Sequence, residues 1–237
     1  MLSSLPRRQV LISLLAVSAS GLALAACGES EQAQTPAAPS TPGAPAAPAA
    51  QIPPSSGNVD MAKLLEPGPL PEKVLGNADA PVTIVEYSSM TCPHCASFHE
   101  KTLPTIKEKY IDTGKARLVM REFPFDPRAE AGFMLARCAD NNYFAMIDVL
   151  FRQQRGWATA DNASEALLQI ARMAGFSQES FTACLTNQKL LDDVRAVRTR
   201  GAETFGVDST PTFFINGKTY KGAMSVDEMS ALIDSLI

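Results

Sequence analysis

Two cysteines separated by two residues lie in the stretch EYSSMTCPHCASFHE, residues 86–100. They are Cys92 and Cys95, and they enclose Pro93 and His94. A pair with this spacing can supply half of a metal site, close a small structural disulfide, or act as a dithiol that exchanges electrons with other thiols. The other residues of the chain discriminate among these three chemistries.

A structural disulfide is a poor interpretation of this pair, because closing so short a loop restrains the unfolded chain very little. A structural zinc site needs four ligands. The chain has two histidines, His94 and His99, both beside the pair, and it has no second C-x-x-C pair. Redox chemistry is therefore favoured, and we expect no metal and no cofactor beyond the Cys92–Cys95 disulfide itself. We expect His99, one turn past Cys95, to be a surface residue.

The preceding residues indicate how the pair is held. Residues 80–89, APVTIVEYSS, are rich in β-branched residues and predict a strand that is buried on both faces. Pro93 suits the first turn of a following helix, where its missing N–H is no loss. Cys92 would then lie at a helix N-terminus, where unpaired N–H groups and the helix dipole favour a thiolate. A neighbouring His94 can stabilise that thiolate further.

A second strand is predicted over residues 115–125, KARLVMREFPF. The connection from the first strand is a helix, so we expect the two strands to be parallel with a right-handed crossover. Pro104 is expected to kink that helix and Gly114 to end it.

Helical spacing of apolar residues dominates the next part of the chain. The predicted segments lie near 127–140, 142–154, 164–174, 178–185 and 188–205. A β-hairpin that turns at Asn216-Gly217 is predicted within residues 209–225. A C-terminal helix follows, with Ser225 and Glu228 forming a capping box.

The order of strand, CPHC and helix, followed by TPTFFING and a C-terminal helix, resembles the thioredoxin superfamily. The CPHC motif and the helical insertion resemble its DsbA-type branch of exported thiol-disulfide oxidoreductases. The resemblance covers roughly residues 72–237. It implies an α/β, thioredoxin-like fold over residues 58–237, with a helical insertion at about 127–205.

The resemblance also implies a role for each residue of the site. Cys92 is the exposed nucleophile, Cys95 is its buried partner, and Pro211 has a cis peptide bond and faces both. The physical chemistry agrees, because only an exposed sulfur can exchange with a protein substrate. The backbone of Thr210, exposed before a cis Pro211, could pair with an extended substrate strand. An ordinary proline at a strand start is the alternative for Pro211.

Glu86 precedes Cys92 by six residues, at the inner end of the first predicted strand. The resemblance implies that an acid at this place lies beneath the active site and relays protons to the buried thiol of Cys95. The alternative is a solvent-facing carboxylate at the end of a strand.

Two further cysteines, Cys138 and Cys184, lie in the helical insertion. The chain is predicted to be exported, and four cysteines, an even number, remain when Cys27 is left out. Both features favour a structural disulfide between Cys138 and Cys184. Two buried free thiols are the alternative, since cysteine packs as a small apolar residue.

Residues 1–26 have a basic start, an apolar run and small residues at the end, which is typical of an export signal. LAAC at 24–27 resembles a bacterial lipobox, which implies cleavage before Cys27 and a lipid on its sulfur. Ordinary cleavage after Ala26 and an uncleaved anchor are the alternatives. Residues 27–57 are rich in Ala and Pro and predict an extended linker. The expected location is therefore the periplasm or cell envelope, with a lipid anchor in a membrane.

The sequence as a whole predicts a dithiol oxidase that introduces disulfides into reduced, unfolded exported proteins. The resemblance implies a membrane partner linked to quinones that reoxidises it. A formal net charge of −4 without a basic stripe argues against a nucleic acid partner. A reductase or isomerase of the same fold is the first alternative, which Thr210 before Pro211 favours. A metal chaperone using Cys92, Cys95 and His94, and an inactive tethered binding module, are the others.

Overall fold

The computed structural model describes residues 51–237. The predicted export signal, Cys27 and most of the predicted linker lie outside the described residues. The end of that linker differs from the prediction, because Gly57 lies in the first strand of the sheet and Ser56 hydrogen-bonds to it. The Ser56 amide donates to the carbonyl of Thr219 at 2.8 Å.

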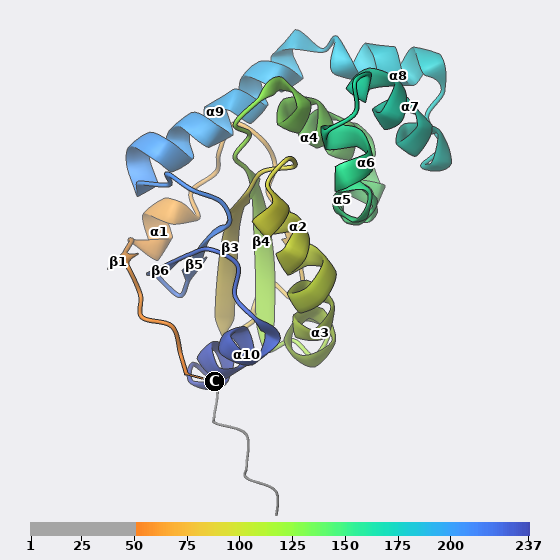
Figure 1. Ribbon diagram of the computed structural model, residues 1–237. Coiled ribbons are helices and arrows are strands. Elements are labelled where there is room, and N and C mark those ends of the chain that lie inside the picture. The colour runs from red at the N-terminus through yellow and green to blue at the C-terminus, as the bar shows by residue number, and fades with distance from the viewer. Residues whose placement is uncertain (1–50) are drawn as a thin grey trace, which may run out of the picture. The chain divides into compact units, whose positions relative to one another are not determined.

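One mixed sheet of six strands, in the order β1-β6-β5-β3-β4-β2, forms the centre of the fold (Figure 1). β3 (Val82–Ser88) and β4 (Ala116–Glu122) lie side by side and are parallel, as the helical connection between them predicts. Every residue of β3 is buried, which agrees with its continuous run of apolar and β-branched residues. β5 (Thr212–Ile215) pairs antiparallel with the other side of β3.

The predicted hairpin connects β5 to β6 (Lys218–Lys221). Its two turn residues, Asn216 and Gly217, have φ angles of 44° and 89°. A two-residue hairpin turn of type I′ needs positive φ at both central residues, which explains the Asn-Gly pair.

Two short strands that the sequence did not predict complete the edges of the sheet. β1 (Gly57–Asn58) pairs antiparallel with β6, and β2 (Lys73–Leu75) pairs antiparallel with β4. Both edges of the sheet are therefore formed by very short strands, which offer little backbone for another chain to pair with.

The two faces of the sheet are covered by different helices. One face packs against the long helical connection and α10 (Val226–Asp234), through side chains such as Phe98 and Met229. The other face packs against α1 (Met61–Leu64) and α9 (Gln188–Phe205).

At Gly201, α9 comes so close to the sheet that an added Cβ would lie 2.6 Å from the Tyr87 ring. Gly206 then ends α9 in the left-handed conformation, with φ of 68°.

The connection from β3 to β4 is one interrupted helix. α2 (Pro93–Ser97) leads into the π-helical turn η1 (Phe98–Thr102), and α3 (Leu103–Ile106) leads into a second π-helical turn, η2 (Lys107–Ile111). Pro104, which has no amide hydrogen to donate, lies in α3 between these two turns. The expected interruption at this proline therefore takes the form of π-helical turns on both sides.

The helical insertion lies over the carboxyl ends of β3 and β4 (Figure 1). Its elements are α4 (Pro127–Cys138), η3 (Asp140–Asn142), α5 (Tyr143–Arg152), α6 (Gln154–Ala158), α7 (Ala163–Met173), α8 (Gln178–Leu185) and the first part of α9. The expected disulfide between Cys138 and Cys184 is present and joins α4 to α8, with a Cα–Cα distance of 6.2 Å.

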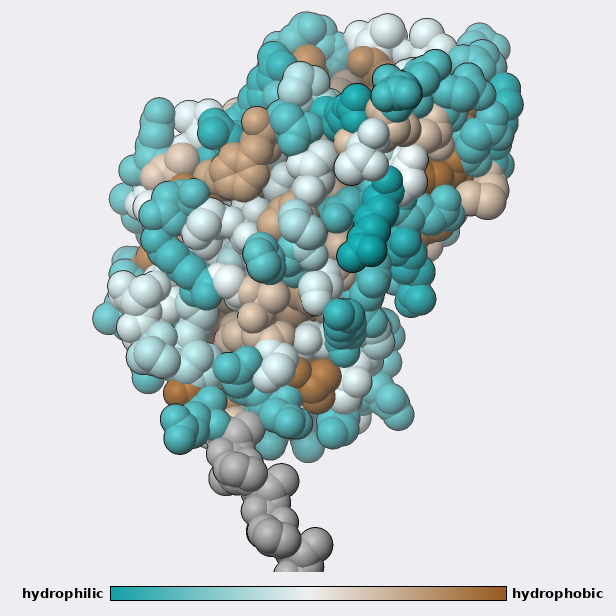
Figure 2. Space-filling model, in the orientation of Figure 1, coloured by the Kyte–Doolittle hydropathy of each residue, from teal (hydrophilic) through white to brown (hydrophobic). Residues whose placement is uncertain are grey.

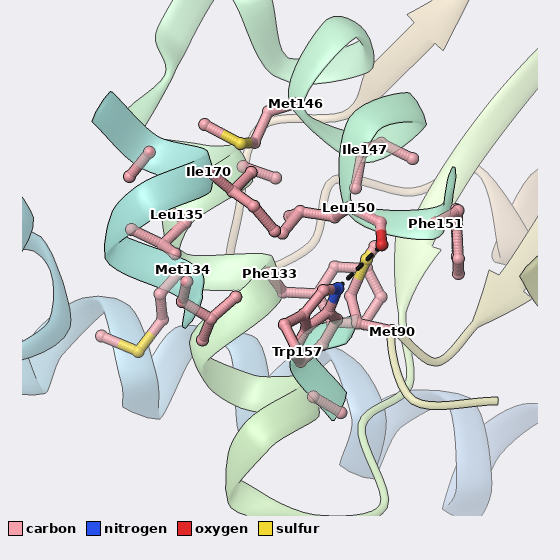
Figure 3. Close-up of a cluster of buried hydrophobic side chains, with 14 of the residues drawn as sticks. Met90, Phe133, Met134, Leu135, Met146, Ile147, Leu150, Phe151, Trp157 and Ile170 are labelled. Carbon is pink, nitrogen blue, oxygen red and sulfur yellow. Dashed lines mark hydrogen bonds between the residues drawn. The ribbon is translucent and has the colours of Figure 1, made fainter. Parts of the chain in front are cut away.

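The insertion has its own apolar core, in which Trp157 packs with Met90, Phe133 and Leu150 (Figure 3). The Trp157 indole is fully buried and donates to the carbonyl of Leu150 at 2.8 Å. Because Met90 belongs to the loop before Cys92, this core extends directly to the candidate site.

Polar side chains cover most of the surface over the insertion, and apolar ones occur between them in small groups (Figure 2). Within residues 51–237, no helix is both long and apolar enough to cross a membrane.

Candidate active site

Cys92 and Cys95 lie where β3 ends and α2 begins. Cys92 is the N-cap residue of α2, with extended backbone angles, and Pro93 follows at the first helical position. Cys92 is partly exposed, whereas Cys95, one turn into the helix, is fully buried. Both are free thiols, so the structure is that of the dithiol form.

The two thiols have opposite electrostatic environments. A hydrogen bond from the Cys95 thiol, the Thr210 side chain and the backbone amides of Cys95 and His94 together lower the pKa of Cys92 to about 5, against the opposing effect of burial. Burial raises the pKa of Cys95 well above its ordinary value, and the nearby Glu86 charge adds to this. Near neutral pH the pair therefore holds one thiolate, on the exposed sulfur.

His94 contributes its backbone amide to this stabilisation, and its imidazole is exposed. A contribution of the ring itself stays a prediction.

The Thr210–Pro211 peptide bond is cis and lies against Cys92. In its protonated form, the Cys92 thiol donates to the carbonyl of Thr210 at 3.3 Å. Thr210 and Pro211 thus lie beside the exposed sulfur. They are the two residues that the sequence predicts to bind the substrate.

Glu86 is fully buried, so the alternative of a solvent-facing carboxylate is wrong. The expectation for His99 is also wrong, because His99 is only 4% exposed. Its Nε2 lies 3.0 Å from both carboxylate oxygens of Glu86. The reason is helical spacing: His99 follows Cys95 by four residues, so both side chains lie on the same inward face.

Three further residues of the site carried no recognisable signal in the sequence. Gln154 of α6 is buried and donates to the carbonyls of Met90 and Cys92, both at 2.9 Å. The hydroxyl of Thr91 donates to Asp126 at 2.6 Å. These contacts join the loop that carries Cys92 to the helical insertion. They depend on tertiary packing between distant segments, which local sequence patterns do not report.

Ser88 is the third residue. It follows Glu86 by two residues along β3, on the same face of the strand. The buried Ser88 Oγ has no hydrogen-bond partner among residues 51–237. The same hydroxyl nevertheless acts to lower the pKa of Cys95. The hydroxyl therefore lies close enough to the sulfur to stabilise a thiolate there.

A groove of about 570 Å³ runs beside α2, and its lining includes Pro93, Ala96, Phe151 and Gln154. In residues 51–237, no cluster of three or more His, Cys, Asp or Glu side chains is placed to bind a metal ion.

Comparison with known proteins identifies the family of this site. A family model described as thioredoxin matches residues 70–235. The crystal structure of alpha-DsbA1 from Wolbachia pipientis matches with a TM-score of 0.68 and 33% sequence identity, covering 73% of this chain and 94% of that chain. The chain is a DsbA-type member of the thioredoxin superfamily.

Two other relatives define the limits of this similarity. A Rickettsia bellii protein, provisionally named a protein-disulfide oxidoreductase, is 34% identical over 168 residues. The aligned part is 70% of this DsbA-type chain and 64% of that relative's length. A protein-disulfide isomerase from Novosphingobium aromaticivorans shares the fold, with a TM-score of 0.61 and 22% identity, covering 69% of this chain and 96% of that chain.

Proposed function

We propose that this protein is a thiol-disulfide oxidoreductase that works as a dithiol oxidase, introducing disulfides into reduced, unfolded exported proteins. The single observation that carries this proposal is the place of Cys92, a partly exposed thiol at the N-terminus of α2 beside the buried Cys95, where its pKa is lowered to about 5. A stabilised thiolate stabilises the dithiol form relative to the disulfide near neutral pH. The Cys92–Cys95 disulfide is then the less stable and more oxidising partner.

The catalytic cycle follows from the exposures of the two sulfurs. A substrate thiolate attacks Cys92, the accessible sulfur, and forms a mixed disulfide while Cys95 is displaced. A second substrate thiol then completes the substrate disulfide and leaves the dithiol. The backbone before Pro211, beside Cys92, supports the entry of an extended substrate segment. This cycle needs no cofactor beyond the Cys92–Cys95 disulfide, and a membrane partner linked to quinones reoxidises it.

The direction of electron flow is tested by the reduction potential of the Cys92–Cys95 pair, measured at equilibrium against glutathione. We expect a value well above the roughly −270 mV of thioredoxin. The pair in Thr210→Val should be less oxidising, because the Thr210 side chain helps to lower the pKa of Cys92. A wild-type value as low as that of thioredoxin replaces the oxidase with the reductase or isomerase.

The proposed location is the cell envelope, with residues 1–26 as the export signal and a lipid on Cys27. The motif LAAC directly after an apolar run supports this. In bacteria that express the full chain, Cys27→Ser should move the protein from the membrane fraction to the soluble fraction. The purified variant should keep the wild-type rate of thiol exchange. Wild-type protein found only in the soluble fraction contradicts the anchor.

A further inference from the structure

Cys95 changes its protonation state in every turnover, although it has no contact with solvent. When a substrate attacks Cys92, the sulfur of Cys95 leaves as an anion in a fully buried place. Burial and the Glu86 charge both destabilise that anion. The leaving sulfur must therefore receive a proton, and the reverse reaction must remove one.

Glu86 is the buried acid whose charge acts on this thiol, and its one titratable hydrogen-bond partner in the described residues is His99. The residues paired with it on the adjacent strands, Met120 and Phe213, carry no titratable group. Within residues 51–237, its carboxylate oxygens have one hydrogen-bond partner, His99 Nε2 at 3.0 Å, and the tautomer of the ring decides which group donates. The hydroxyl of Ser88, on the same strand face, has a free donor and acceptor beside Cys95.

His99 connects this buried carboxylate to the outside of the protein. Its ring packs against Phe151 at a centroid distance of 4.4 Å and lines a pocket of about 270 Å³ beside α5. The pocket also contains Leu103, Phe144 and Ile147. No hydrogen bond joins His99 Nδ1 to another side chain or carbonyl of residues 51–237. One ring nitrogen thus contacts Glu86, and the other has no hydrogen-bond partner in the described residues, on a ring that lines the pocket.

We propose that His99 carries the proton that Cys95 gains and loses, passing it between Glu86 and the pocket beside α5. This inference rests on the proposed function only in requiring thiol-disulfide exchange at Cys92 and Cys95. In the direction that oxidises the protein, the Cys95 thiol attacks the Cys92 sulfur of a mixed disulfide. The Cys95–Cys92 bond forms, the bond from Cys92 to the other thiol breaks, and that thiolate leaves with the electron pair.

The proton of Cys95 goes to the Glu86 carboxylate during this attack. In the ring tautomer that carries its hydrogen on Nδ1, His99 then accepts the proton of the Glu86 carboxyl group at Nε2 and releases the Nδ1 hydrogen to water in the pocket. The reverse sequence delivers a proton to Cys95 when a substrate displaces it. His99 is therefore a positioning and proton-transfer residue that acts on the reacting sulfur through Glu86.

Other titratable groups lie near Glu86 and His99. Lys107, Asp148 and Arg152 line the same pocket, and Arg152 is paired with Asp148 at 2.9 Å. The Tyr143 hydroxyl of α5 has a pKa well above its ordinary value, because of burial first and the nearby Glu122 and Glu86 charges. Tyr143 therefore stays protonated throughout and does not compete for the transferred proton.

The experiment separates the two chemical steps. The reduced full-length protein is mixed with oxidised glutathione, quenched with acid at intervals, and analysed by peptide mass. The first step forms the mixed disulfide on Cys92, and the second converts it to the Cys92–Cys95 disulfide. We expect His99→Phe and His99→Gln to slow the second step about tenfold or more, within the range of general acid–base catalysis. The first step should be unchanged, because Cys92 is accessible to solvent.

The variants distinguish proton transfer from packing. His99→Gln keeps an amide that can hydrogen-bond to Glu86 but cannot carry a proton. His99→Phe leaves the buried Glu86 charge without a partner and can fail to fold, and in that case His99→Gln still provides the test. The matched control is Ile147→Val, which changes the lining of the same pocket and should leave both steps unchanged. The pH dependence of the second step should change shape in the His99 variants and not in the control. Glu86→Gln combined with His99→Gln should be no slower than Glu86→Gln alone, because both act in one path.

Two results overturn the proposal: a second step at the wild-type rate in His99→Gln, or equal slowing of both steps. A wild-type protein that never forms the Cys92–Cys95 disulfide refutes the proposed function instead. A wild type that completes both steps, with variants that match it, refutes only the role of His99.

Discussion

Cys92 and Cys95 lie three residues apart along the chain but differ in access and in charge. Because the pKa of Cys92 is about 5 while burial raises that of Cys95, alkylation of the reduced protein should label Cys92 first throughout the weakly acidic range. The labelling rate should fall by half near pH 5, as the thiolate becomes protonated. Peptide mapping after short exposure to iodoacetamide measures both rates. Equal labelling of the two cysteines contradicts their assigned roles.

Residue types and spacing were enough to predict much of the site. The C-x-x-C pair, a proline at the first helical position and the Thr-Pro pair are local features, and each has a specific physical consequence. The prediction fails at His99. Its polar side chain predicts a place at the surface, but it shares a helical face with the buried Cys95 and is buried as well. A buried carboxylate paired with it overrides the usual preference of histidine for partial exposure.

At the scale of elements, the close approach of α9 to β3 gives a test with an internal control. Gly201→Ala should lower the free energy of unfolding by about 1–3 kcal/mol, because its Cβ would overlap the fully buried Tyr87 ring. Gly156→Ala in α6 meets nothing within 4 Å and should raise it by about 0.5–1 kcal/mol, by favouring the helix. Urea denaturation of the two variants and the wild type measures both changes. A Gly201→Ala protein as stable as the wild type rules out so close a contact.

Elements with a long periodic signal were predicted well, and short ones were missed. β3, β4 and the helices of the insertion follow their hydrophobic patterns, and the turn at Asn216-Gly217 follows from backbone chemistry. β1 and β2 have two and three residues, too few for any alternation to be recognised. The π-helical turns around Pro104 and the contacts of Gln154 depend on packing between distant segments.

At the scale of the whole molecule, the Cys138–Cys184 disulfide closes a loop with a sequence separation of 46. Replacing both cysteines with Ala should lower the free energy of unfolding by about 2–5 kcal/mol, since the loop-entropy model alone gives about 4 kcal/mol. The pH profile of Cys92 alkylation should stay unchanged, because the bond lies between α4 and α8. Urea denaturation and alkylation of the same preparation provide both readouts. A shifted alkylation profile would mean that this bond also shapes the active site.

The redox state of the active site should change the stability of the whole protein. In the background lacking Cys138 and Cys184, we expect the dithiol form to melt at a higher temperature than the disulfide form near pH 8. Cys92 has a folded pKa of about 5 against an ordinary value of 9.0, so its contribution is complete above that value and is lost as pH falls toward 5. The raised pKa of Cys95 adds nothing in this window, because that thiol stays protonated in both states. The difference in melting temperature should therefore shrink steadily from pH 8 to pH 5, and an oxidised form that is the more stable at pH 8 contradicts the oxidase.

Trp157 is the single tryptophan of the chain, and it lies fully buried against Met90, two residues before Cys92. All indole emission therefore comes from one place beside the reacting sulfurs. We expect opening or closing of the Cys92–Cys95 bond to alter the surroundings of that ring, which would give the protein its own optical reporter. Its fluorescence can follow each turnover in real time, without a label and without a coupled enzyme.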